Sequence, residues 1–146
     1  MGACEWQKKR GRADLGVDAM EREVTRNVQV SVESFFLEHE SVPDLERYSF
    51  AYKIQLKNLG QSRVQLISRH WIITDGTGEE RHVHGDGVVG KQPMLEPGEE
   101  FEYMSGSLLP TPVGTMQGSY QMINDAGEVF DVRIPVFTLA VPGSFN

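Results

Sequence analysis

The chain has 146 residues, of which 39% are hydrophobic and 24% charged, and its formal net charge is −7. This length suits one domain with a single core, and the composition is ordinary for a soluble globular protein. No apolar run approaches the ~20 residues that span a bilayer, so membrane insertion is not expected.

Charge is unevenly distributed along the chain. Residues 1–12 carry a net charge of +3, which leaves −10 for residues 13–146. An acidic body repels phosphate backbones, so we expect no nucleic acid partner. The basic residues are not followed by an apolar segment of the secretory type, which indicates a cytoplasmic location. Cys4 is the only cysteine, which excludes an internal disulfide and a cysteine zinc site and predicts an inert, exposed thiol.

The sequence pattern changes within the N-terminal region. Residues 1–22 mix charge, glycine and small residues without a sustained period, and we interpret them as a flexible extension that precedes a domain at 23–146. From Val24 to Leu37, apolar residues then alternate with polar ones, which predicts the first strand. Residues 38–47 contain a proline and are expected to form a loop.

Two strands and a hairpin follow. Residues 48–56 alternate most cleanly of all, and residues 64–74 alternate with a change of phase that predicts a bulge near Leu66 and Ile67. The turn signal at residues 75–78 leads into a short return strand at 79–84.

The second half of the chain repeats this pattern. Strands are predicted at 101–105, 116–123 and 129–139, separated by a stiff connection at 108–114 and a hairpin loop at 124–127. In the last strand we expect Phe130, Val132, Ile134 and Val136 to face inward. Pro135 would then face outward, and because it cannot donate to a ladder it predicts an edge strand or a strand that is locally unpaired at that residue.

These features predict an all-β fold, an antiparallel β-sandwich of about seven strands that is Ig-like or fibronectin type III-like. No helix is predicted. Periodicity alone leaves a closed barrel as the alternative.

A glycine motif stands between the predicted return strand and the next strand. Gly85, Gly87 and Gly90 have the spacing G-x-G-x-x-G, which in a dinucleotide-binding fold opens a helix. Here Pro93 favours an extended conformation for Gln92, so no helix follows the third glycine. We therefore interpret this segment as a long loop between strands, in which glycine supplies positive φ angles.

From about Val28 to Pro142 the chain resembles bacterial ApaG proteins. The resemblance lies in residues 47–52, 58–60, 64–66, 69–76, 85–93, 97–99, 103–106, 111–120 and 134–137. It implies a fibronectin type III-like sandwich and an association with cobalt and magnesium tolerance or efflux phenotypes. Related domains in F-box and polymerase-delta-interacting proteins imply protein binding, and the neighbouring genes point to nucleotides.

We therefore expect a protein-binding or adaptor module with an unknown protein partner, a monomer or homodimer, and not an enzyme. No cofactor is expected. The predicted surface combines the glycine loop with the connection at 110–118. The alternative is a phosphate, pyrophosphate or nucleotide ligand in a nest of loop N–H groups, with charge from Lys91, Arg69 or Arg81. The binding candidates are Gly85, Gly87, Gly90, Lys91, Gln92, Pro93 and Arg69.

Histidines provide a weaker metal candidate. His82 and His84 share one face of the predicted return strand, and His70 could lie one strand away. Imidazole nitrogens suit Co²⁺ or Zn²⁺. Exposed strands also carry solvated histidines without any ion, so no metal site is assigned from the sequence.

Overall fold

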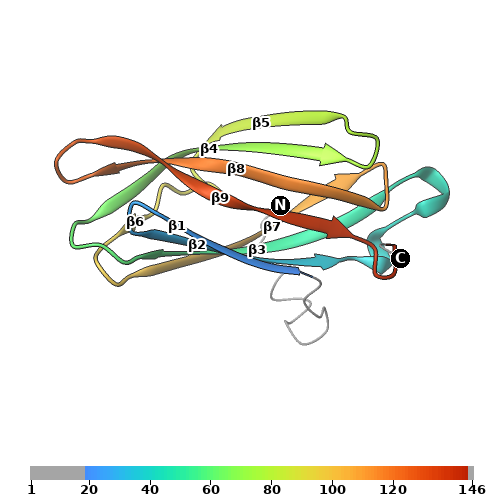
Figure 1. Ribbon diagram of the computed structural model, residues 1–146, viewed down its shortest axis with the longest axis horizontal. Helices are drawn as coiled ribbons and strands as arrows, with labels where there is room; N and C mark the ends of the chain where they lie inside the picture. The colour runs from blue at the N-terminus through green and yellow to red at the C-terminus, as the bar shows by residue number, and fades with distance from the viewer. Residues whose placement is uncertain (1–18, 145–146) are drawn as a thin grey trace.

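The computed structural model describes residues 19–144, which form nine strands in two layers (Figure 1). The strands are β1 Ala19–Thr25, β2 Val28–Phe36, β3 Tyr48–Asn58, β4 Val64–Asp75, β5 Glu80–Asp86, β6 Met94–Leu95, β7 Glu100–Leu109, β8 Val113–Asn124 and β9 Val129–Ala140. Two short 3-10 helices, η1 Glu38–Glu40 and η2 Pro43–Leu45, occupy the predicted loop before β3. No helix in this part of the chain is long and apolar enough to cross a membrane.

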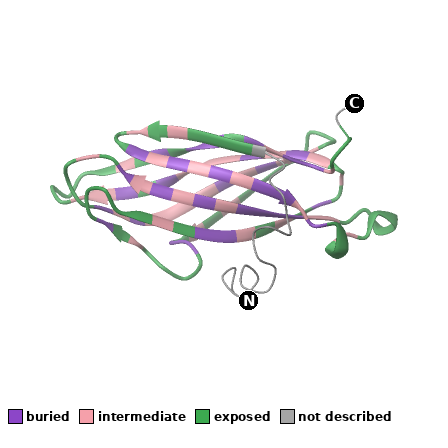
Figure 2. Cartoon of the chain, turned by 90° about the horizontal axis from the view of Figure 1, so that it is seen from below, coloured by how far each residue is buried: buried purple, intermediate pink, exposed green. Residues whose placement is uncertain are grey.

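The first sheet has the order β1-β2-β3-β7 and the second the order β5-β4-β8-β9, with β6 added beside β4. All pairs are antiparallel, so the predicted β-sandwich is confirmed. Buried and more exposed residues alternate along the strands (Figure 2). The inward residues of both sheets form one core, in which Trp71 packs edge to face on both Tyr52 and Phe137.

The first predicted strand is wrong in one respect, because it is two strands. β1 and β2 are joined by Arg26 and Asn27, whose φ angles are +50° and +66°. This turn contains no glycine, so the alternation of apolar and polar residues gave no sign that one strand ended and another began. The predicted domain boundary at residues 22 and 23 falls inside β1. The predictions for Cys4 and for residues 1–18 lie outside the described residues.

The register of two strand pairs, β4–β8 and β8–β9, is interrupted by a bulge. The β4–β8 register shifts between Leu66 and Ser68, which confirms the bulge predicted there. In β9, however, the prediction that Val136 faces inward is wrong, since Val136 is 48% exposed and Pro135 is buried. Two residues of β9 stand opposite Gln117 at this point, and the extra residue reverses the phase. β9 is an edge strand, as Pro135 predicted.

The two long sides of the sandwich differ. On one side β9 lies against the first sheet. The Arg133 N–H donates to Thr25 Oγ1 at 3.2 Å, Arg133 Nε lies 3.2 Å from Glu23 Oε2, and Ser34 Oγ donates to the Thr138 carbonyl at 3.1 Å. The edge strands of the other side, β5 and β7, are separated by a crevice.

Candidate functional site

The glycine loop connects β5 to β6 and turns sharply at its tip. Val88 donates its N–H to the Lys91 carbonyl at 2.8 Å, and Lys91 donates back to Val88 at 2.9 Å. Between them, Val89 and Gly90 have φ angles of +43° and +79°. Two central residues with positive φ are typical of a type I′ turn, which glycine accepts and a β-branched residue resists.

The loop is fixed to the bulge of β4. The carbonyl of Ile67, the bulged residue, accepts hydrogen bonds from the Gly87 N–H at 2.8 Å and from Gln92 Nε2 at 2.9 Å. Next to it, Leu66 donates its N–H to the Pro93 carbonyl at 3.0 Å. Gln92 and Pro93 therefore hold the loop against β4.

Arg69 organises the other side of the loop. Its Nη1 donates to the carbonyls of Asp86 at 3.0 Å and Gly87 at 2.7 Å. Gly85 stands opposite Arg69 in the β4–β5 ladder, and a Cβ atom there would lie 2.7 Å from the guanidinium carbon. The structure thus brings Arg69 and the glycines together, with the guanidinium bound to loop carbonyls.

This geometry bears on the predicted nest of N–H groups. The N–H groups of Gly87, Val88 and Lys91 all donate to protein carbonyls. The Lys91 residue is exposed at the turn. Closed hydrogen bonds of this kind leave fewer donors for an anion at the tip of the loop.

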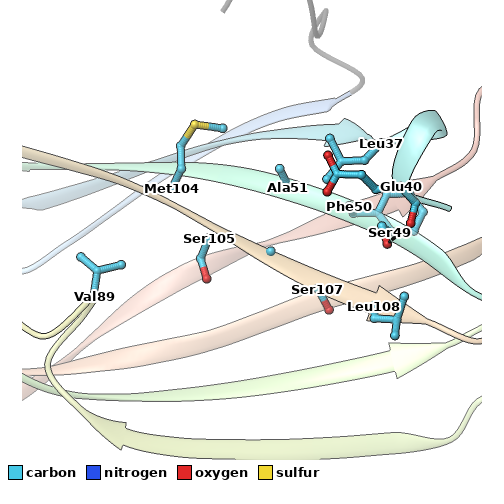
Figure 3. Close-up of a pocket in the computed structure, with 11 residues that line it drawn as sticks. Leu37, Glu40, Ser49, Phe50, Ala51, Val89, Met104, Ser105, Ser107 and Leu108 are labelled. Atoms are coloured by element: carbon cyan, nitrogen blue, oxygen red, sulfur yellow. Dashed lines mark hydrogen bonds between the residues drawn. The ribbon is translucent and has the colours of Figure 1, made fainter. Parts of the chain in front are cut away.

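A groove runs along the outer face of β3 and β7, and we call it the outer groove (Figure 3). Its volume is about 420 Å³. In Figure 3, Val89 and Met104 lie towards one end, with Leu37, Glu40 and Leu108 towards the other. Gly106 lies between Met104 and Leu108 in β7, and its missing side chain leaves the floor open. The lining residues are Leu37, Glu40, Ser49, Phe50, Ala51, Val89, Met104, Ser105, Gly106, Ser107 and Leu108.

The outer groove is apolar although it belongs to an outward face. Leu37, Ala51 and Met104 are buried there in a small cluster with Phe35, separate from the main core. Leu108 is 49% exposed and Val89 is 40% exposed. The sequence did not predict the groove residues of β3 and β7, and of the groove only the glycine loop, which contains Val89, was part of the predicted surface. The available signal was that Met104 and Leu108 occupy the outward phase of β7, which they share with Glu100 and Glu102.

A second hollow, the edge crevice, opens between β5 and β7 and has a volume of about 280 Å³. Arg69 and Arg81 line it from the second sheet, and Ser105 and Ser107 line it from the first. Ser107 Oγ is buried and has no hydrogen-bond partner among the described residues. Among the described residues no carboxylate forms an ion pair with either arginine, and Arg69 donates to the loop carbonyls of Asp86 and Gly87.

The glycine loop and the first residues of the 110–118 segment contact different parts of β4. The loop is bound at the start of β4, whereas the Gly76 N–H, just beyond the end of β4, donates to Thr111 Oγ1 at 2.8 Å. From Val113 onward the segment is part of β8, between β4 and β9. A Cβ atom at Gly118 would lie 2.0 Å from the His70 carbonyl, so this glycine serves close strand packing.

The three histidine candidates do come together. His70 lies opposite His84 in the β4–β5 ladder, and the His82 ring also stacks on His70. Desolvation, followed by the charges of His84 and His82, lowers the pKa of His70.

Comparison with known proteins gives one consistent result. Residues 38–124 match the model of the ApaG domain family, DUF525. The chain is 53% identical over 115 residues to Protein ApaG of Escherichia coli O1:K1 / APEC, covering 79% of this chain and 92% of that protein. The crystal structure of the putative ApaA protein from Bordetella pertussis has a TM-score of 0.78 at 44% identity, covering 88% of this chain and 99% of that chain. None of these descriptions names a reaction.

Proposed function

The chain belongs to the ApaG domain family, and on that premise we propose that it is a protein-binding module that takes an extended segment of a partner along the outer groove. The observation that carries the proposal is the position of this groove. An apolar hollow with exposed side chains lies beside β7, the edge strand of its sheet.

The free edge supports binding of an extended chain. Within the described residues β7 pairs only with β3, so its other edge has unpaired backbone groups. A peptide that adds to such an edge gains main-chain hydrogen bonds, while pockets beside the strand select its side chains. Met104 to Leu108 spans four residue steps of about 3.3 Å each, enough for a peptide to place two side chains in the groove.

The loop tip supports the same surface. Val89 is a β-branched residue held at positive φ, partly exposed, and it lines the groove. Such backbone strain persists where the surrounding structure imposes it, and it is concentrated at functional sites. In this proposal the glycine loop contributes to binding through the side chain of Val89, which lines the outer groove.

The test is capture of partners from the source cell with matched variants. Leu108→Glu places a charge in the outer groove, and Val136→Glu places one on β9 at the same exposure, 48% against 49%. We expect Leu108→Glu to lose the captured protein and Val136→Glu to retain it, with both variants folded by circular dichroism. Equal capture by both variants would contradict the proposal. So would equal loss.

An anion in the edge crevice is a second candidate function. Arg69 and Arg81 face this crevice in a chain whose residues 13–146 carry a net charge of −10. Beside them lies the Ser107 hydroxyl, which has no hydrogen-bond partner among the described residues. Arginine forks suit phosphate oxygens. Titration with pyrophosphate should then shift the NMR signals of Arg81, Ser105 and Ser107. Shifts confined to residues 85–91 would favour the nest instead, and an unresponsive spectrum would remove both.

Under the main proposal, an effect on cobalt or magnesium tolerance would be exerted through the bound partner. To distinguish a binding module from an enzyme, the purified protein is incubated with nucleotides and diadenosine polyphosphates, and their turnover is measured. We expect no turnover.

A further inference from the structure

Three of the four histidines of the chain form one cluster on the outer face of the second sheet. His70 comes from β4, and His82 and His84 come from alternate positions of β5. The His70 and His84 rings stack at a centroid distance of 4.1 Å and an angle of 11°, and the His70 and His82 rings lie 5.1 Å apart at 28°. One nitrogen from each residue can be chosen so that all three lie within 4.8 Å of one another.

The closest contact in the cluster shows how its nitrogens are oriented. His70 Nε2 lies 2.9 Å from His82 Nδ1. Two neutral imidazoles at this distance share one proton, with one nitrogen donating and the other offering a lone pair. A cation that replaces this proton can accept lone pairs from both rings.

We propose that His70, His82 and His84 bind a divalent transition-metal ion such as Zn²⁺, Ni²⁺ or Co²⁺. Metal–nitrogen bonds of about 2.0–2.1 Å place tetrahedral ligands about 3.3 Å apart. One pair of nitrogens lies 2.9 Å apart, and one nitrogen from each of the three residues lies within 4.8 Å of the others, so small side-chain rotations suffice to reach this spacing. The backbone needs no change, because the β4–β5 ladder fixes the relative position of the three residues.

Glu80 supplies a further group to the site. Its Oε1 lies 3.5 Å from His82 Nε2, on the opposite side of the ring from the nitrogen that faces His70. A carboxylate that accepts the second N–H of a ligating histidine fixes the tautomer and raises the basicity of the ligand. We assign this positioning role to Glu80, and water completes the coordination.

The donor set also selects the class of ion. Mg²⁺ prefers oxygen ligands in an octahedral arrangement, whereas imidazole suits Zn²⁺, Ni²⁺ and Co²⁺. The cluster should therefore discriminate against Mg²⁺, and it is independent of the outer groove and of the edge crevice.

The test is a Zn²⁺ titration of the full chain, followed by imidazole ¹H–¹⁵N NMR and calorimetry. We expect one equivalent to bind, to shift the rings of His70, His82 and His84 together, and to raise Tm. His82→Ala and His84→Ala should each weaken Zn²⁺ binding by roughly tenfold or more, because loss of a group that only hydrogen-bonds to a metal ligand already weakens binding by about this factor. Millimolar Mg²⁺ should leave these rings unchanged.

Two controls keep the result specific. His39→Ala alters the remaining histidine, on η1, and Cys4→Ser removes the only thiol. Both should retain the affinity of the wild type. Loss of binding in either control with retention in His82→Ala and His84→Ala would place the metal elsewhere and overturn the proposal, as would failure of the wild type to bind.

Discussion

At the scale of single residues, Val89 is the clearest conflict between local preference and observed structure. A valine at a φ angle of +43° has its Cβ close to the following carbonyl, at a cost of about 1–2 kcal/mol. Its side chain is 40% exposed and so contributes little core burial in return. We infer that its conformation is imposed by the hydrogen bonds of Val88 and Lys91 and by the attachment of the loop to β4.

This predicts an order of stabilities within the loop. Val89→Gly should raise the free energy of unfolding by about 1 kcal/mol, because glycine accepts positive φ. Gly90→Ala should lower it by a similar amount, since φ is +79° but the space is open. Gly87→Ala should lower it most, because its Cβ would lie 2.2 Å from the Lys91 carbonyl oxygen. Urea unfolding measures all three, and a stabilising Gly87→Ala would contradict the assignment. Under the proposed function, Val89→Gly should also weaken partner capture.

Tyr103 and Tyr120 form a buried pair that connects the two sheets. Their hydroxyl oxygens lie 2.5 Å apart, and both side chains are buried. Burial raises the pKa of Tyr103 well above its usual value of 10, and burial likewise raises that of Tyr120. The folded state therefore keeps both protons at a pH where the unfolded chain has released them.

Two measurements follow from this pair. Stability should fall as the pH rises above about 10, because the unfolded state then binds fewer protons than the folded state. Tyr103→Phe should cost about 1–3 kcal/mol by leaving the Tyr120 hydroxyl unsatisfied, whereas the double variant with Tyr120→Phe should cost less than the sum of the single changes. Urea unfolding at pH 8 and pH 11 tests both points. Additive single costs would show that the hydroxyls do not interact.

At the scale of elements, β1 shows that the sandwich begins earlier than alternation indicated. Residues 19–22 pair with residues 31–34 of β2, and β1 also presents Glu23 and Thr25 to Arg133 of β9. A chain that begins at residue 23 loses four cross-strand pairs. We expect its free energy of unfolding to be roughly 1–3 kcal/mol lower than that of a chain beginning at residue 19.

A matched variant separates pairing from the ion pair. Glu23→Ala keeps β1 intact and removes the contact between Glu23 and Arg133, whose side chains are 36% and 65% exposed. Exposed ion pairs stabilise little, so this variant should be close to the wild type. Equal stability of the two shortened chains would show that residues 19–22 do not contribute.

The errors of the sequence analysis have a common physical origin. Alternation correctly indicated β3, β4 and the β4–β5 hairpin, because each strand there is half buried and each turn has glycine or aspartate. It failed where the backbone departed from period 2 without a usual marker, at Arg26 and Asn27 and at the Pro135 bulge. The outer groove could be predicted only in part: Met104 and Leu108 on the outward phase of β7 were a signal, but the groove also joins the tip of one loop to strands distant in the sequence. Arg69 was identified by its charge, but its contacts with loop carbonyls depend on register.

At the scale of the whole molecule, the sandwich has one closed long side and one open long side. Contacts between β9 and the first sheet close one side, and β5 and β7 leave the other side open. Central strands in such an arrangement have backbone groups paired on both sides, whereas edge strands are paired on one.

Hydrogen exchange should reflect this asymmetry. In the free protein, amides of β3 and β8 should exchange most slowly, and alternate amides of β7 should exchange much faster. Binding of the captured partner should slow those β7 amides selectively. If β7 were protected as well as β3 in the free protein, its edge would not be available and the proposed mode of binding would be wrong.

The position of two edge strands, β5 and β7, on the same side of the sandwich limits how this protein can assemble through them. Two copies that paired through these edges would be related by a two-fold axis, and each copy would cover the edge strands of the other. In such an isologous pair neither β5 nor β7 remains as a template for a third copy. Assembly through β5 and β7 therefore leads to a closed dimer or a single added strand rather than to a filament.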